Sequence, residues 1–222
     1  MHARCGKLLE VDLTSGAVRT GRVPAEVLTS WLGGRGLGVH LMKDRMTLDP
    51  YDERMLLVFS VGPLCGTAAP TSSRMSVVSR SPLTGTIFDS SVGGHLPVKL
   101  KQAGYDAVAV TGKAKAPVLL SIQEERVEIR DASQLWGRGT GEVVRMLEKD
   151  GQVACIGPAG ERLVRMANIM IGGNDSVGRG GMGALMGAKN LKAIVVDGSR
   201  KPTVADPAAF QKAYQDVLRL FK

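Results

Sequence analysis

The chain has 222 residues, of which 44% are hydrophobic, so it is long and apolar enough to bury one large core or two small ones. Its formal net charge of +8 favours anionic ligands such as phosphates or an acidic protein partner. Aromatic residues make up only 4% and do not alternate with arginines, which argues against nucleic acid as a partner. No apolar run approaches the roughly 18 residues that a membrane span needs, and no signal-peptide core opens the sequence. We therefore expect a cytoplasmic protein without a membrane span.

The three cysteines, Cys5, Cys65 and Cys155, are far apart in the sequence. None belongs to the Cys-x-x-Cys pair that indicates a metal or redox site. Isolated cysteines usually pack as small buried hydrophobic residues, and this is the interpretation we adopt for all three.

The first half of the chain predicts strands with short helices between them. Pro24 at a first-turn position and Gly33-Gly34 at the far end delimit the first helix. The predicted elements are a hairpin of strands 7–13 and 17–20, helices at 24–32 and 37–46, strands at 55–61 and 74–79, a turn at 82–85, and a helix within 93–103.

The second half continues in the same manner. The predicted elements are strands at 107–111, 118–122, 127–130 and 192–196, with amphipathic helices at 142–149 and 208–221. Asp206 and Pro207 form a cap and first-turn pair for the last helix, which resembles the start of another domain. We therefore expect one domain over residues 1–202 and a truncated helical domain over 203–222, in a fragment or a split subunit.

Two sequence echoes suggest that the chain consists of two related halves. The Val-Gly-Pro of residues 61–63 is answered by Ile-Gly-Pro at 156–158, and Gly-Arg-Gly-Leu-Gly at 34–38 resembles Gly-Arg-Gly-Gly-Met-Gly at 178–183. Because strands and helices do not alternate regularly, the fold class is predicted as α+β, with mainly antiparallel sheet and a ligand near the axis between the halves.

The glycine cluster at 178–183 formally matches a dinucleotide-binding fingerprint, but the residues before it are polar and turn-like instead of forming a buried strand. A second interpretation is that its backbone N–H groups open a helix and bind phosphate, with Arg179 as an added donor. A third is that the glycines only allow tight packing. All three remain open at this point.

Two other segments are candidates for ligand binding. Arg74 follows a loop of small residues, from which a long cation can reach across a cavity or simply face solvent. Residues 90–94 offer small side chains and free carbonyls, which suit Mg²⁺ if phosphates supply its other ligands. His95 lies beside this segment, and no serine–histidine–aspartate arrangement can be assembled. The residues alone therefore predict a phosphate-bearing cofactor held by glycine loops and two arginines.

At these residues the sequence resembles the N-terminal domain of the tungsten-containing aldehyde ferredoxin oxidoreductases. The matching segments include Leu-Gly-Gly-Arg-Gly-Leu-Gly at 32–38, Ser-Pro-Leu-Thr-Gly at 81–85, Ala-Gly-Tyr-Asp-Ala at 103–107, Gly-Pro-Ala-Gly-Glu at 157–161, Gly-Arg-Gly-Gly at 178–181 and Met-Gly-Ala-Lys-Asn-Leu-Lys-Ala-Ile at 186–194. Their order is continuous from residue 6 to about residue 201.

The resemblance implies a two-halved base for a tungstopterin, in which tungsten or molybdenum is held by two pterin dithiolenes and their phosphates are bridged by Mg²⁺. It implies that Arg74 lies between the pterin and a 4Fe-4S cluster, and that Ser91 and Ser176 contact Mg²⁺ through their backbone carbonyls. The implied cofactor-binding residues are Arg74, Ser91, Val92, Gly93, Gly94, Ser176, Gly178, Arg179 and Gly180. Asp175 departs from the family pattern, because an arginine is expected there, and this weakens one phosphate contact.

The resemblance also implies what the complete enzyme does. An aldehyde and water give a carboxylic acid, and two electrons pass through tungsten and the cluster to ferredoxin. The cluster ligands and the substrate cavity belong to downstream domains or a complementary subunit, so no catalytic residue is assigned and the chain is expected to be inactive alone. A homo-oligomer is compatible with the sequence. The alternative is a stand-alone, non-redox subunit that binds a pterin or another phosphorylated ligand.

Overall fold

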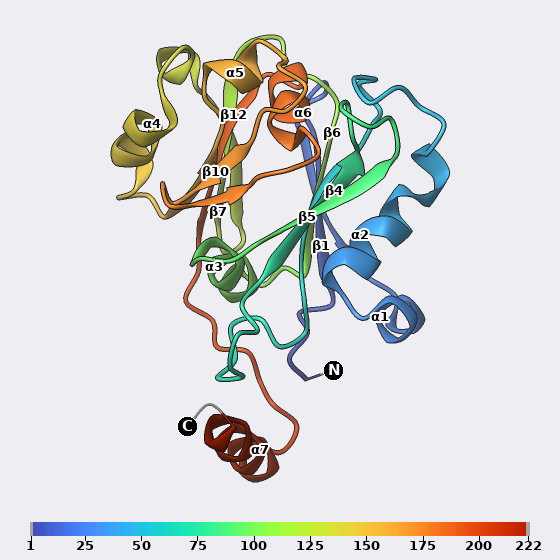
Figure 1. The fold of residues 1–222 in the computed structure, drawn as a ribbon, viewed down its shortest axis with the longest axis vertical. Coiled ribbons are helices and arrows are strands. Elements are labelled where there is room, and N and C mark those ends of the chain that lie inside the picture. Colours follow the sequence, from blue (N-terminus) through green and yellow to red (C-terminus); the bar gives the residue numbers. More distant parts are fainter. Residues whose placement is uncertain (1, 221–222) are drawn as a thin grey trace.

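The computed structural model describes residues 2–220, which form two six-stranded sheets (Figure 1). The first sheet contains β1 (Lys7–Asp12), β2 (Ala17–Arg22), β3 (Leu57–Val61), β4 (Met75–Arg80), β5 (Ile87–Val92) and β6 (Ala107–Thr111). The second contains β7 (Val118–Gln123), β8 (Arg126–Asp131), β9 (Gln152–Cys155), β10 (Ile169–Ile171), β11 (Asp175–Val177) and β12 (Leu191–Asp197).

The two sheets have the same topology. The first has the strand order β2-β1-β6-β3-β4-β5, and the second, counted from β8, has the order β8-β7-β12-β9-β10-β11. In each sheet one pair is parallel, β1 with β6 and β7 with β12, and every other pair is antiparallel. Strands β1 to β6 therefore correspond in chain order to β7 to β12, which confirms the predicted α+β fold of two related, mainly antiparallel halves.

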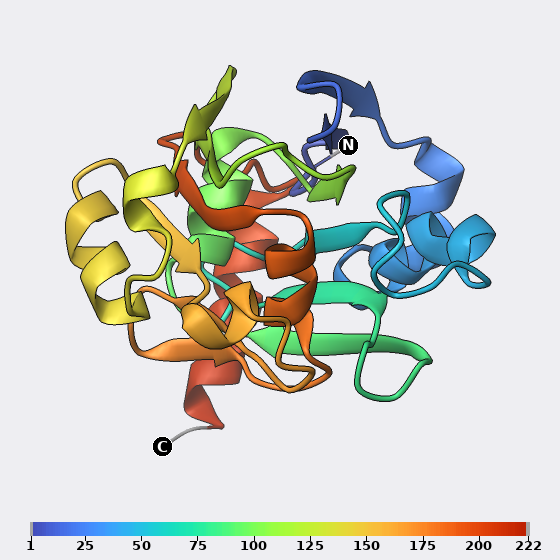
Figure 2. The ribbon, with the colours of Figure 1, turned by 90° about the horizontal axis from the view of Figure 1, so that it is seen from above.

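The helices occupy equivalent layers in the two halves. After β5 and β11 come α3 (Leu96–Ala103) and α6 (Met182–Ala188), whose apolar side chains belong to the main core shared by both sheets. The outer face of the first sheet is covered by α1 (Ala25–Trp31) and α2 (Gly34–Met42), and that of the second by α4 (Thr140–Leu147), at opposite sides of the molecule (Figure 2). The short α5 (Pro158–Glu161) packs on α6, and 3-10 turns occupy Lys43–Arg45 and Ser133–Leu135.

Most predicted elements are confirmed, with boundaries shifted by at most four residues. Helix α2 begins at Gly34, earlier than the predicted residue 37. Strands β5, β9, β10 and β11 and helix α5 were not predicted. Strand β5 carries polar residues in its middle, which interrupt the alternation that identifies a strand. Strands β10 and β11 have only three residues each, too few to show an alternation.

The structure confirms one sequence echo and corrects the other. The Val-Gly-Pro and Ile-Gly-Pro segments follow the equivalent strands β3 and β9. The glycine cluster at 178–183, however, follows β11, and the equivalent strand β5 is followed by Gly93 and Gly94. The segment at 34–38 lies in α2, after β2, so its resemblance to 178–183 does not reflect the duplication.

Helix α7 (Pro207–Arg219) lies apart from the two sheets and has no buried residue (Figure 1). The predicted cap is confirmed, since the Asp206 carboxylate accepts a hydrogen bond from the Ala209 amide at 2.9 Å. The predicted end of this helix at residue 221 lies outside the described residues, and the domain division after residue 202 stays a prediction. Among residues 2–220, no helix is both long and apolar enough to cross a membrane.

The close approach of α5 and α6 provides a test of the fold. A Cβ atom at Gly187 in α6 would overlap the carbonyl oxygen of Gly160 in α5. We therefore expect Gly187→Ala to lower the free energy of unfolding by about 1–3 kcal/mol, as over-packing does elsewhere. Gly141→Ala in α4, where the nearest atom is the Arg145 Nη1 at 3.8 Å, should instead stabilise by about 0.5–1 kcal/mol. Urea unfolding measures both, and equal midpoints for the two variants would contradict this packing.

Candidate functional site

The edge strands of the two sheets, β5 and β11, lie side by side and antiparallel. A Cβ atom at Gly94 would lie 2.8 Å from the Asp175 carboxylate, and one at Gly180 would overlap the Phe88 ring. Each strand ends within the same tripeptide, Ser-Val-Gly, at residues 91–93 and 176–178, whose glycine follows the strand. We call residues 88–94 and 175–180 the seam. Because β5 and β11 are equivalent in the duplication, the seam presents the same backbone segment twice, once from each half.

A cavity of about 340 Å³ lies on the seam. It contains four of the nine predicted cofactor-binding residues, Ser91, Ser176, Gly178 and Arg179. The complete lining is Arg35, Phe88, Asp89, Ser90, Ser91, Ser176, Gly178 and Arg179. Segments about 85 residues apart in the sequence thus meet at one open, polar surface, which we call the seam cavity.

Arg74 lies next to the seam cavity but does not line it. Arg74 immediately precedes β4, and the first residue of β4, Met75, pairs with Val92 of β5. From there the Arg74 Nη2 donates to the backbone carbonyl of Ser91 at 3.4 Å. The predicted arginine is therefore in contact with one of the two carbonyls that the resemblance implies as Mg²⁺ ligands.

The remaining predicted residues differ in what they can contact. The Val92 side chain is 2% exposed and belongs to the core between the sheets, so only its backbone faces the seam. No atom lies within 4 Å of a Cβ built at Gly93, which leaves open space there. Gly94 and Gly180 have φ values of +80° and +78°, a conformation that favours glycine, and both are in close contact across the seam. Gly180 is thereby occupied in packing against Phe88.

The interpretation of residues 178–183 as a phosphate-binding helix start is not supported by the geometry. Helix α6 begins only at Met182, and the Gly183 amide already donates to the Ala167 carbonyl at 2.9 Å. Cβ atoms at Gly181 and Gly183 would overlap the carbonyl oxygens of Arg165 and Asn168. Tight packing, the third interpretation from the sequence, accounts for these two glycines, and only Gly178 and Arg179 remain at the cavity.

Sequence reasoning missed two charged residues of the cavity, Arg35 and Asp89. They form an ion pair with 2.8 Å between the Arg35 Nε and the Asp89 Oδ2. The position of Arg35 within the glycine cluster at 33–36 was the one sequence signal that pointed to it. Asp89, its ion-pair partner, lies on β5, a strand that the sequence did not predict. The cavity thus offers guanidinium donors and backbone groups, which suits binding and orienting an anion, and the carboxylate that lines it, Asp89, is paired with Arg35.

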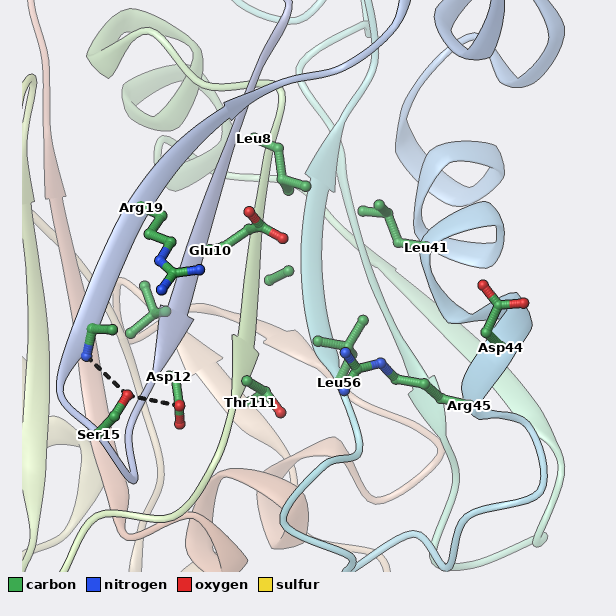
Figure 3. Close-up of a pocket in the computed structure, with 13 residues that line it drawn as sticks. Leu8, Glu10, Asp12, Ser15, Arg19, Leu41, Asp44, Arg45, Leu56 and Thr111 are labelled. Atoms are coloured by element: carbon green, nitrogen blue, oxygen red, sulfur yellow. Dashed lines mark hydrogen bonds between the residues drawn. The ribbon is translucent and has the colours of Figure 1, made fainter.

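A larger cavity, of about 410 Å³, lies elsewhere, on the outer face of the first sheet between the β1–β2 hairpin and the end of α2. Figure 3 shows Glu10 and Arg19 facing each other there from neighbouring strands. The Asp12 carboxylate accepts a hydrogen bond of 2.7 Å from the Ser15 hydroxyl, which lowers the pKa of Asp12 and commits it to the hairpin turn. This larger cavity is lined by charges of both signs and by none of the predicted cofactor-binding residues. The seam cavity is therefore the candidate site.

Comparison with known proteins identifies relatives along nearly the whole chain. Residues 8–198 match the family model described as aldehyde ferredoxin oxidoreductase, N-terminal domain. A tungsten-containing aldehyde ferredoxin oxidoreductase of Pyrococcus horikoshii is 45% identical over 97% of this chain and 37% of its own length. The aliphatic sulfonate oxidoreductase, WOR-like subunit, of Pyrococcus furiosus is 38% identical over 90% of this chain and 35% of its own length.

Among solved structures, the active site complex BamBC of benzoyl coenzyme A reductase, in complex with 1,5-dienoyl-CoA, has a similar fold. It superposes with a TM-score of 0.95 at 39% identity, covering 98% of this chain and 34% of the other. The chain therefore spans a little over a third of the length of these relatives. Together with the duplicated sheets and the glycine motifs, these matches show that the chain belongs to the aldehyde ferredoxin oxidoreductase family, in which it corresponds to the N-terminal domain.

Proposed function

We propose that this chain binds a tungstopterin on the seam cavity, as the N-terminal domain of an enzyme that oxidises an aldehyde with water to a carboxylic acid. The electrons would leave through a 4Fe-4S cluster, held by downstream domains, to ferredoxin in the cytoplasm. The observation that carries the proposal is the pair of Ser-Val-Gly segments side by side next to Arg179. The names of the relatives, which specify tungsten, aldehyde and ferredoxin, support it.

The residues at the seam fit a cofactor with two like, phosphate-bearing halves. Such a ligand matches a surface built twice, and the open space at Gly93 lets it approach the backbone closely. Mg²⁺ prefers oxygen ligands and is usually bound by few protein groups together with phosphates. The backbone carbonyls of Ser91 and Ser176 are the groups we propose for it. The Ser91 carbonyl, which already accepts from Arg74, retains a second lone pair.

When bound, the tungsten centre would supply the two-electron chemistry. The residues of this chain bind and orient: Arg179 offers planar N–H donors to a phosphate, and Arg74 donates to the Ser91 carbonyl. Asp175, beside Gly94, disfavours a phosphate at its own position and favours a nearby cation. No residue of this chain is proposed to react with substrate.

The substrate is set outside this domain. Relatives with similar N-terminal domains are named for aldehyde, sulfonate and benzoyl-CoA chemistry, and the sulfonate and benzoyl-CoA proteins are 38% and 39% identical to this chain. A non-redox subunit that binds a pterin without tungsten is the second candidate, and the homo-oligomer stays a prediction. Assaying the full-length protein for tungsten, iron and pterin discriminates between these candidates, because pterin without tungsten or iron would favour the non-redox subunit.

The site assignment is tested by single alanine substitutions of Arg179 and Arg74 in the full-length protein. Loss of a charge-assisted hydrogen bond should weaken phosphate-linked binding about 10-fold or more, so bound pterin and tungsten should fall when cofactor is limiting. Arg126→Ala, in an exposed ion pair with Glu128, is the control for loss of a positive charge. Pterin fluorescence and elemental analysis give the occupancy. Unchanged contents in both seam variants would overturn the assignment.

A further inference from the structure

We propose that Arg35 is a second anion-binding residue of the seam cavity, and that Asp89 holds its guanidinium group in position for a phosphate. The inference rests on the proposed function, because it assigns one more contact to the same cofactor site. Arg35 comes from α2 and Arg179 from the residues after β11, so the cavity receives one arginine from each half of the molecule.

The ion pair leaves the outer edge of the guanidinium group free. The Arg35 Nε lies 2.8 Å from the Asp89 Oδ2, and no other polar partner of Arg35 occurs within residues 2–220. The Arg35 side chain is 67% exposed, whereas Asp89 is 21% exposed. A guanidinium group has five N–H donors in one plane. The ion pair lies at Nε, and neither terminal amino group makes a hydrogen bond within residues 2–220, so these two groups can donate to two oxygens of one phosphate.

The backbone around Arg35 is fixed by close packing. A Cβ atom at Gly36 would overlap the Trp31 carbonyl, and one at Gly38 would overlap the Val78 side chain in β4. Helix α2 is therefore held tightly against β4, next to β5, and its first turn can move little relative to Asp89. The glycines place Arg35 at the seam, which the sequence motif did not reveal.

A second guanidinium group adds N–H donors for a phosphate at the seam cavity. A phosphate there carries close to two negative charges and several acceptor oxygens, of which the planar group of Arg179 can contact two. Asp175 adds a negative charge where the family resemblance implies an arginine. The alternative is an ordinary surface ion pair between α2 and β5, which contributes about 0–1 kcal/mol and has no effect on ligands. The two alternatives differ in what they predict for anion binding.

The test uses inorganic pyrophosphate as the probe, with the full-length protein prepared from a host that cannot make the pterin. Isothermal titration calorimetry compares Arg35→Gln, Arg35→Lys and Arg179→Gln with Arg126→Gln, the control that removes the same charge from an exposed pair with Glu128. We expect Arg35→Gln and Arg179→Gln each to weaken binding about 10-fold or more, and Arg126→Gln less than about 2-fold. The affinity of Arg35→Lys should lie between those of Arg35→Gln and the unsubstituted protein, because lysine keeps the positive charge but loses the planar pair of N–H donors.

The outcomes separate this inference from the proposed function. If Arg179→Gln weakens binding and Arg35→Gln behaves like Arg126→Gln, the role of Arg35 is refuted and the seam site stands. If neither seam variant weakens binding, or the unsubstituted protein does not bind pyrophosphate, both the site and this inference are overturned. Full binding by Arg35→Lys would contradict the two-donor contact. Equal urea midpoints for all variants show that each is folded.

Discussion

Replacing Glu161 with glutamine is expected to destabilise the protein by about 3–5 kcal/mol, because it leaves a buried ammonium group without a counter-charge. The Lys192 and Glu161 side chains are 0% and 5% exposed and form an ion pair. The Lys192 Nζ also donates to the Arg138 carbonyl at 2.9 Å, and Glu161 accepts from the Gly137 amide at 2.9 Å. This cluster joins β12, α5 and the segment before α4. Urea unfolding, extrapolated to water, gives the free energy.

Two further variants isolate the charge as the cause. Glu128→Gln breaks an exposed ion pair with Arg126 and should cost less than about 1 kcal/mol. Lys192→Met combined with Glu161→Gln removes both charges and should recover most of the loss, since apolar replacements of buried pairs are often neutral. A loss below 1 kcal/mol for Glu161→Gln, or no recovery in the double variant, would contradict this account.

Alkaline solution is expected to destabilise the fold sharply above pH 9, because two buried thiols resist ionisation. Burial raises the pKa of Cys65 and of Cys155 from 9.0 to about 11. Both residues are 0% exposed. Between pH 9 and pH 11 the unfolded chain loses thiol protons that the folded chain keeps. Stability is therefore fully present below pH 9 and declines as pH rises toward 11, by about 2–3 kcal/mol for each thiol.

Lys189 acts in the opposite direction over an overlapping range. Its ammonium group donates to the carbonyls of Glu53 and Gly112 at 3.2 and 3.3 Å, joining the two halves. Burial is the main cause that lowers the pKa of Lys189 from 10.5 to about 8. Between these values the folded chain binds fewer protons than the unfolded chain, so this group makes stability rise with pH. Lys189 therefore offsets part of the stability lost at alkaline pH, but one group does not offset the combined effect of both thiols.

The measurement is the free energy of unfolding from urea titrations at pH 7.5, 8.5, 9.5 and 10.5. Burial also raises the pKa of the half-buried Cys5 to about 11, so the variant must replace all three thiols. The unsubstituted chain should show a decline above pH 9, whereas Cys5→Ala, Cys65→Ala and Cys155→Ala combined should show stability that rises from pH 8 to 10.5. Lys189→Met should remove that rise. An identical pH dependence for the cysteine variant and the unsubstituted chain would refute the role of the thiols.

Sequence reasoning could identify the elements whose residues show a clear period. Strands β3, β6 and β12 are nearly continuous apolar runs, and α4 and α7 are amphipathic helices with identifiable starts. The duplication was suspected from short echoes, but its correct register could not be derived, because β10 and β11 are too short to recognise. The equivalence of residues 91–93 and 176–178 became visible only with the strand order.

The candidate site shows the same limit. Ser91, Ser176, Gly178 and Arg179 were named through family resemblance, and the structure brings them to one cavity. Arg35 and Asp89 were missed because their proximity depends on how α2 packs on β4, which no local pattern encodes. Conversely, Gly180, Gly181 and Gly183 looked like ligand-binding residues, although a Cβ at each would overlap a neighbouring group. Glycine in a motif does not distinguish contact with a ligand from contact with the chain itself.

The duplicated seam is symmetric in its backbone and asymmetric in its side chains. Counting from the shared Ser-Val-Gly segments, Ser90 in one half corresponds to Asp175 in the other, and Gly94 corresponds to Arg179. In the antiparallel seam Asp175 lies beside Gly94, whereas Arg179 precedes Gly180, which packs against Phe88. A ligand with two identical ends would therefore meet the acid near one end and the arginine near the other. The two ends would bind with unequal strength and would ionise differently, so a chemically symmetric ligand becomes polarised by the surface that holds it.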